Sequence, residues 1–193
     1  MIISHSHKFI FVKSPKIGGT SIVEYLEPYL DEDLRNRDRG DHEQFNEIIN
    51  IVPNYQEYFK FGFVRNPWDM RLSRYFYLIQ KEIPKHKKLG KPYREEVLSY
   101  KSFNDYCKNE PWFPSKNQID FLSNNLNFYG KYESLQDDFD TICNKINIPK
   151  QKLPHNNKSK HKHYTEYYDN HTIKLVAEKH AKDIEYFGYK FGE

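Results

Sequence analysis

The chain has 193 residues, within the size of one domain, and its 30 basic and 27 acidic residues give a net charge of only +3. Hydrophobic residues make up 37% of the chain and aromatic residues 17%, so buried rings can supply a core, and a disordered chain is excluded. The balanced charge also excludes a polybasic protein that coats nucleic acid.

Strands are predicted at residues 8–13, 59–64 and 128–132, which are rich in β-branched and aromatic side chains. Apolar side chains at helical spacing predict a helix after each strand, and a last helix from Asn170 to Phe187. Thr20 or Ser21 is expected to cap the helix after the first strand, and Ser134 the helix after the third. Other helices are predicted to begin at 41–42 and to lie around 102–108 and 115–123, whereas the lysine-rich residues 81–101 indicate an exposed excursion.

Strands that alternate with helices predict right-handed crossovers and a parallel sheet. We therefore expect an α/β fold of three layers, P-loop-like, with a central, mainly parallel sheet flanked by helices, in a single domain over residues 1–193. Ligands bind such sheets beyond the carboxyl ends of the strands. The loops after Lys13 and Val64 are therefore the expected places for chemistry.

The first of these loops has the composition of an anion-binding turn. It reads SPKIGGTS at residues 14–21 and opens a helix. The two glycines let the backbone curl and expose N–H groups, the helix adds its own N–H groups, and Lys16 adds a full charge. These features favour a phosphate or sulfate ligand over an ordinary strand-to-helix turn. The alternative interpretation is a P-loop-like nucleotide kinase. In an ATP-binding P-loop, however, the lysine follows the glycines, whereas here it precedes them, which argues against an ATP P-loop but not against a relative of it.

The second loop begins RNPWDMRLSRY at residues 65–75. The planar guanidinium of Arg65 suits bidentate binding of an oxyanion. Ser73 follows about 80° beyond two helical turns, so the two side chains can converge only if Arg65 lies before the helix. An arginine at the sheet edge with a serine facing solvent is the alternative. Two such loops would bind a ligand with two separated anionic groups.

In their joint order these motifs resemble the PAPS-dependent sulfotransferases (PAPS is 3′-phosphoadenosine 5′-phosphosulfate), in particular the carbohydrate sulfotransferases and their short soluble bacterial relatives. The 5′-phosphosulfate loop of that family, roughly P-K-T-[AG]-[GS]-T-S, is similar to residues 15–21, and its 3′-phosphate motif, roughly [FV]-x-R-[DN]-P-[YW]-[DE]-R-x-x-S-x-Y, to residues 63–75. YESL at 132–135 and DIEYFGY at 183–189 extend the resemblance over nearly the whole chain. Ile17 and Met70 depart from the pattern, which expects a threonine and an arginine there.

The resemblance implies a sulfotransferase that moves the sulfuryl group of PAPS to a hydroxyl, leaving PAP, without a metal. Lys16 would contact the sulfate and stabilise the leaving group. The residues implied to bind the donor are Lys16, Gly18, Gly19, Thr20, Ser21, Arg65, Ser73, Ser159 and Lys160. His42 is the candidate general base, since an imidazole has a pKa of about 6.5. Glu43 is the fallback and Glu24 a weaker alternative.

The expected partner is a hydroxyl-bearing acceptor, a glycan or glycolipid. Single-stranded nucleic-acid binding by residues 155–164, where lysines and an aromatic residue interleave, is a third hypothesis, but the small net charge disfavours it. His161 and His163 have no carboxylate cluster or cysteine pair beside them in the sequence, so no metal site is expected. Two cysteines cannot make a disulfide scaffold, and we expect a soluble, cytoplasmic protein without a membrane span.

Overall fold

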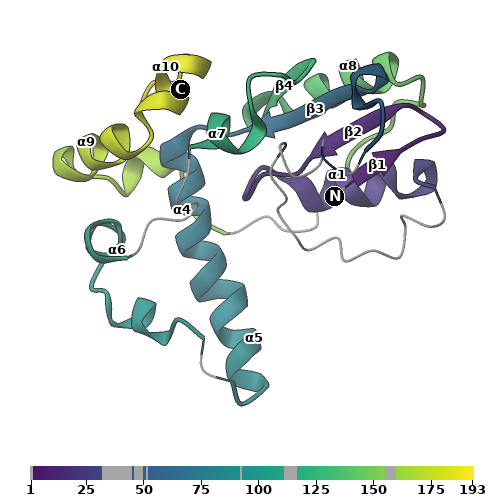
Figure 1. Cartoon of the computed structure of the whole chain (residues 1–193). Coiled ribbons are helices and arrows are strands. Elements are labelled where there is room, and N and C mark those ends of the chain that lie inside the picture. Colours follow the sequence, from purple (N-terminus) through teal and green to yellow (C-terminus); the bar gives the residue numbers. More distant parts are fainter. Residues whose placement is uncertain are drawn as a thin grey trace. The chain divides into compact units, whose positions relative to one another are not determined.

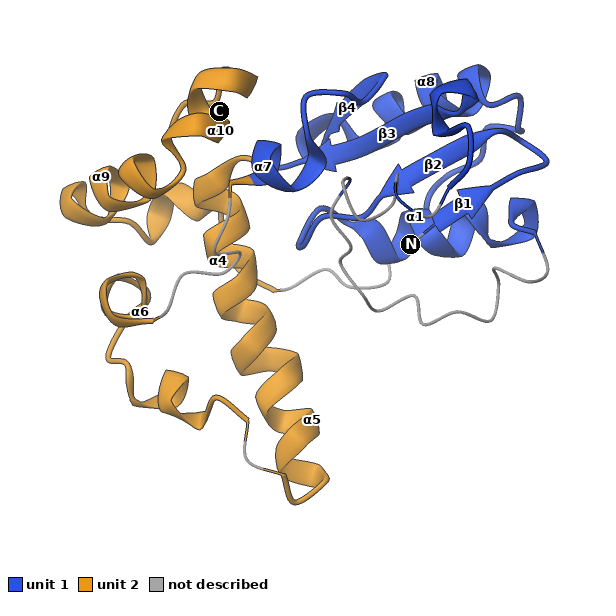
Figure 2. Ribbon diagram, viewed as in Figure 1, with its two compact units in different colours: residues 1–65, 118–157 blue, residues 66–117, 158–193 orange. Residues whose placement is uncertain are grey.

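The computed structural model describes most of the chain, namely residues 2–31, 45, 50, 52–91, 93–110, 117–154 and 160–193. The chain forms two compact units, one of residues 1–65 and 118–157 and the other of residues 66–117 and 158–193 (Figure 2). The single domain expected over residues 1–193 stays a prediction.

The first unit is built on a four-stranded sheet with the strand order β1-β2-β3-β4 (Figure 1). The strands are β1 (Ile2–Ser4), β2 (Phe9–Val12), β3 (Phe59–Val64) and β4 (Phe128–Lys131). Strands β2, β3 and β4 run parallel, which confirms the mainly parallel sheet. Strand β1 pairs antiparallel with β2 and is an additional strand that the sequence pattern does not predict.

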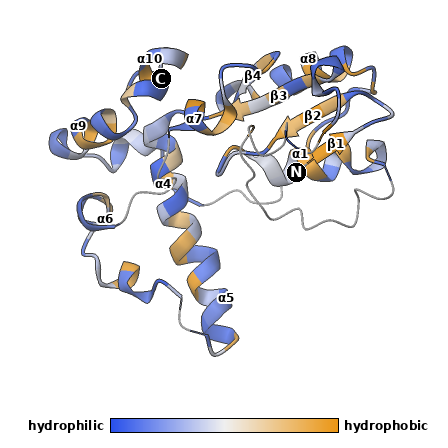
Figure 3. Cartoon of the chain, viewed as in Figure 1, coloured by the Kyte–Doolittle hydropathy of each residue, from blue (hydrophilic) through white to orange (hydrophobic). Residues whose placement is uncertain are grey.

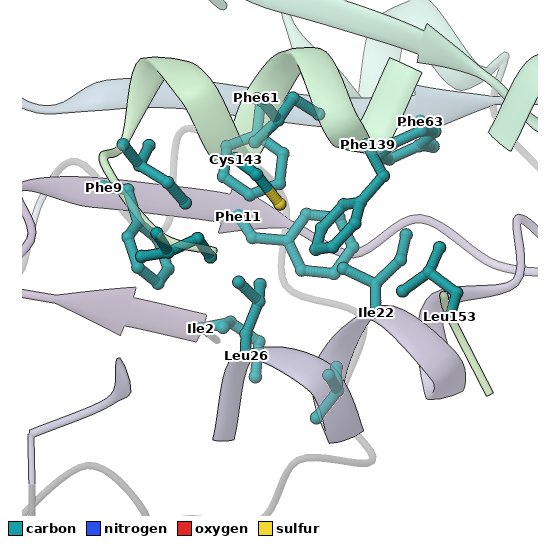
Figure 4. Close-up of a cluster of buried hydrophobic side chains, with 14 of the residues drawn as sticks. Ile2, Phe9, Phe11, Ile22, Leu26, Phe61, Phe63, Phe139, Cys143 and Leu153 are labelled. Carbon is teal, nitrogen blue, oxygen red and sulfur yellow. The ribbon is translucent and has the colours of Figure 1, made fainter. Parts of the chain in front are cut away.

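Among its described residues, the first unit has the helices α1 (Gly19–Leu26), α7 (Gln118–Leu122) and α8 (Leu135–Lys145), with 3-10 turns at Glu27–Tyr29, Tyr55–Glu57 and Tyr132–Ser134. Alternate residues of β2 and β3 bury their rings against α1 and α8 (Figure 4). In this core Phe11 stacks on Phe61 at 5.2 Å between ring centroids. Tyr25 of α1 meets Phe139 of α8 edge to face at 5.1 Å.

The opposite face of the sheet is covered by α7 and the segment after it. Gly62 in β3 lies so close to them that an added Cβ would stand 2.7 Å from Leu122 Cδ2 and 3.1 Å from Leu126 Cδ1. Helices therefore flank the sheet on both faces, and the predicted α/β fold, consistent with a P-loop-like architecture, is confirmed.

The second unit is helical. It contains α4 (Pro67–Tyr77), a π-helical turn (Leu78–Glu82), α5 (Ile83–Lys88), α6 (Phe103–Asn109), α9 (Asn170–Lys179) and α10 (Ala181–Phe187), with 3-10 turns at Glu95–Ser99 and Tyr164–Glu166. The predicted excursion at 81–101 thus contains a helix and a turn, which bury Ile83 and Val97. The predicted last helix is two helices, because His180 ends α9 and begins α10.

Two predicted helix caps are wrong. Helix α1 begins after Gly18, which has a left-handed conformation, and neither Thr20 nor Ser21 caps it. Ser134 stands at the N-cap position of α8, but its hydroxyl donates to Asp138 Oδ2 (2.8 Å) instead of accepting from the backbone. The start predicted at 41–42 lies outside the described residues.

Hydrophobic residues are concentrated on the strands, and β2 is hydrophobic along its length, whereas β1 has two isoleucines followed by a serine (Figure 3). The chain around α5 is mostly hydrophilic in the same view. Among the helices that the structure describes, none combines the length and the hydropathy needed to cross a membrane.

Candidate functional site

The loop between β2 and α1 is anchored at both of its sides. The Ser14 hydroxyl donates to the backbone oxygen of Phe63 at the end of β3 (2.9 Å). Ile17 is completely buried in the core between the sheet and the helices. The departure of Ile17 from the family pattern therefore has a structural role, because its side chain fixes the middle of the loop. Lys16 is half-buried and Thr20 is exposed.

The backbone of this loop turns through left-handed conformations at Lys16 (φ 63°) and Gly18 (φ 75°). An added Cβ on Gly18 would stand 3.1 Å from Leu135 Cδ2 and 3.4 Å from Tyr132 Cε2. On Gly19 it would stand 3.0 Å from Lys13 Cγ. A side chain at either glycine would therefore crowd its neighbours, and Gly18 is also needed for its left-handed conformation.

The first turn of α1 offers backbone donors beside this loop. The N-cap residue Gly18 has no side chain, and no side-chain hydrogen bond caps the helix. The amide of Ser21 donates to Gly18 O (3.0 Å), which closes the turn. The first N–H groups of a helix lack partners within it and carry the positive end of the helix dipole. This backbone, with the hydroxyls of Thr20 and Ser21 and the charge of Lys16, suits a phosphate or sulfate.

Arg65 is held at the end of β3 by contacts on three sides. Its backbone N–H donates to Gln118 Oε1, and Gln118 Nε2 donates to its backbone oxygen, both at 2.9 Å. Its guanidinium lies 3.8 Å from the centroid of the Tyr132 ring. Its Nη1 donates to the backbone oxygen of Lys16 (3.0 Å). The structure thus brings Lys16, Gly18 and Arg65 together in the first unit.

Ser73 belongs to the second unit, in which it is buried on α4. Helix α4 begins at Pro67, and Asn66 caps it by accepting from Trp68 N (3.1 Å). Arg65 therefore precedes the helix, which is the condition that the spacing of Arg65 and Ser73 sets for their side chains to converge.

The two positions around the missing second arginine are both buried. Met70 and Arg71 are each 1% exposed. The guanidinium of Arg71 lies 4.3 Å from the Tyr106 ring centroid, and its Nη2 donates to Glu110 O (3.3 Å). Arg71 therefore contacts α6 and the residue that follows α6, and these contacts are buried.

Lys160 is exposed in the second unit, and its backbone is held by one side chain. Gln80, in the π-helical turn, donates from Nε2 to Lys160 O (2.9 Å) and accepts at Oε1 from Lys160 N (3.2 Å). The neighbouring His161 ring stacks on Phe76 with centroids 5.0 Å apart.

Three predicted site residues, His42, Glu43 and Ser159, lie outside the described residues. Glu24 is exposed on α1. His161 and His163 use Nδ1 for contacts to Lys162 O (2.7 Å) and Thr165 Oγ1 (2.8 Å). Within the part of the chain that the structure describes, no three histidine, cysteine or acidic side chains gather in a way that could hold a metal ion.

Contacts from outside the two loops hold predicted site residues in each unit, from Gln118 and Tyr132 in the first unit and from Gln80 in the second. None of these roles has a local sequence signal, because Gln118 and Tyr132 contact Arg65 from 53 and 67 positions away and Gln80 contacts Lys160 from 80 positions away. YESL at 132–135 marks the place of Tyr132 but not its contact.

Comparison with known proteins identifies the family. A model of the sulfotransferase family matches residues 1–190. No curated protein and no solved structure matches the chain. The family match covers both of the loops described above and nearly the whole chain. The chain belongs to the sulfotransferase family, as its motifs predict.

Proposed function

We propose that this sulfotransferase takes its sulfuryl group from PAPS and transfers it to a hydroxyl of a carbohydrate acceptor, a glycan or a glycolipid. The observation that carries the proposal is the loop after β2. There Lys16 and Gly18 turn through left-handed conformations into an uncapped helix start, with the Arg65 guanidinium bonded to the same loop. The cytoplasm is the location that we propose, because both cysteines are buried free thiols.

The donor has two separated anionic groups, and the proposal gives each its own residues. For the 5′-phosphosulfate these are Lys16, Gly18, Gly19, Thr20 and Ser21. Arg65 and Ser73 are assigned to the 3′-phosphate. Ser159 and Lys160 are assigned to a segment that would cover the bound donor. The crowded glycines and the uncapped N–H groups of α1 support the first assignment. The motif order supports the other two.

PAPS, when bound, supplies the sulfuryl group and a leaving group whose negative charge must be neutralised. Lys16 brings a positive charge to the loop that would hold this end of the donor, so the proposal includes no metal. Loss of one preorganised charge of this kind costs about 10²–10³ in rate. His42 would accept the proton of the acceptor hydroxyl, with Glu43 as the fallback.

The first test is ligand binding. PAP should raise the melting temperature of the protein, and ATP with magnesium should raise it less. The opposite ranking would favour a nucleotide kinase and would contradict the proposal.

The second test is Lys16→Ala with Lys145→Ala as its matched control. Lys145 is an exposed lysine at the end of α8 in the same unit, so its loss removes the same charge away from the loop. Lys16→Ala should lower turnover of PAPS by about 10²–10³ while Lys145→Ala retains it. Equal turnover in both variants would remove Lys16 from the mechanism.

A further inference from the structure

Three strand ends meet at one guanidinium in the first unit. Arg65 follows β3, Lys16 lies in the loop after β2, and Tyr132 follows β4. Arg65 stacks on the Tyr132 ring at 3.8 Å and donates to Lys16 O at 3.0 Å. Arg65 itself is buried, with only 6% of its surface exposed.

The contact to Lys16 acts on a residue with an unfavourable backbone. Lys16 has φ 63°, in the left-handed region that residues with a side chain rarely adopt. Such a conformation persists only where its surroundings impose it. A hydrogen bond from a charged donor is stronger than a neutral one, and here it holds the peptide oxygen of this residue.

The Tyr132 ring supports both partners of this arrangement. One contact is the stack under the Arg65 guanidinium, which a planar cation favours. The other is Gly18, where an added Cβ would stand 3.4 Å from Tyr132 Cε2. The ring therefore fills the space beside the loop as well as orienting the arginine.

We infer that Tyr132 is a positioning residue. Through Arg65 it holds the Lys16 backbone in the left-handed conformation, so the donor loop has its binding shape before a ligand arrives. Arg65 thereby shapes the 5′-phosphosulfate loop in addition to the 3′-phosphate contact proposed for it. The inference rests on the proposed function for its effect on catalysis, but its structural part is independent of any ligand.

The test compares Tyr132→Leu, which removes the aromatic face, with Tyr132→Phe, which retains it. Amide hydrogen exchange of residues 16–19 is measured on the ligand-free chain. Tyr132→Leu should raise their exchange about fivefold to tenfold, the size expected for loss of a buried cation–π contact, and Tyr132→Phe should restore wild-type exchange. Unchanged exchange in Tyr132→Leu, or equal increases in both variants, would overturn the inference.

Arg65→Lys gives a second measurement, which remains informative if Tyr132→Leu does not fold. It keeps the positive charge but loses the planar face, so exchange at residues 16–19 should again rise about fivefold. Wild-type exchange in Arg65→Lys would contradict the inference.

Steady-state kinetics with PAPS then test the effect of Tyr132 on catalysis separately from its effect on the loop structure. Tyr132→Leu should raise the KM for PAPS and lower kcat, with both restored in Tyr132→Phe. If the wild-type protein does not bind PAP, the proposed function fails, whereas the exchange result still decides whether Tyr132 positions the loop.

Discussion

Gly18→Ala is the substitution whose cost can be worked out most directly from the structure. With φ at 75°, a side chain at this position costs about 1–2 kcal/mol for the left-handed conformation alone. The new Cβ would also stand 3.1 Å from Leu135 Cδ2, tighter than an ordinary contact, so that side chain must shift by a few tenths of an ångström. With about 1 kcal/mol for this crowding, we expect the free energy of unfolding to fall by about 2–3 kcal/mol in total.

Gly188→Ala is the matched control. Gly188 ends α10 with φ 70°, and an added Cβ there would meet nothing within 4 Å. Its substitution should therefore cost only the conformational part, about 1–2 kcal/mol. Urea denaturation of both variants measures the two free energies, and their difference isolates the crowding at Gly18.

Binding of PAP distinguishes a structural role of Gly18 from a role in the site. An alanine at φ 75° strains the backbone that we propose holds the 5′-phosphate, so Gly18→Ala should bind PAP at least about tenfold more weakly by isothermal titration calorimetry. Gly188→Ala should bind PAP as the wild type does. If Gly18→Ala loses stability but retains its affinity for PAP, the loop is not the phosphate cradle.

Further predictions concern groups outside this loop. His42→Ala should lower turnover at saturating substrates, so unchanged turnover in that variant would place the base elsewhere. Gln80→Ala removes both hydrogen bonds to the Lys160 backbone and should weaken PAP binding about fivefold in calorimetry, with unchanged affinity as the contrary result. Burial raises the pKa of the thiols of Cys107 and Cys143 to about 11. Neither thiol should react with a thiol reagent at pH 8 before unfolding, and rapid labelling of the native protein would contradict this.

The parts of the fold that follow from local pattern were predictable. Strands β2 and β3 are buried on both faces, so their sequences are nearly continuous runs of apolar residues bounded by polar ones. Lys16, Gly18 and Gly19 could be placed at a strand end because a glycine-rich turn between a strand and a helix has few other uses.

The predictions of secondary structure are wrong where the local sequence pattern is weak or is compatible with two structures. Strand β1 has only three residues, too few for a periodic pattern. The hydroxyls of Thr20 and Ser134 suit an N-cap. However, Gly18 stands at the N-cap position of α1, and the Ser134 hydroxyl donates its hydrogen bond to Asp138. No glycine or proline marks the break between α9 and α10 at His180. The spacing of apolar residues alone therefore predicts one helix where there are two.

The contact between Arg65 and Tyr132 shows what is missing from the motifs. In the parallel pairing of β3 with β4, Val64 stands opposite Lys131, so Arg65 and Tyr132 are the next residues of both strands beyond the same sheet edge. A register shifted by one residue would turn Tyr132 to the other face and away from the guanidinium. The register depends on Gly130, because an added Cβ there would stand 2.3 Å from Phe63 Cε1, and only a glycine lets that ring lie across β4. The partner of Arg65 is therefore determined by a packing contact inside the sheet, two residues before Arg65 and Tyr132 on their strands.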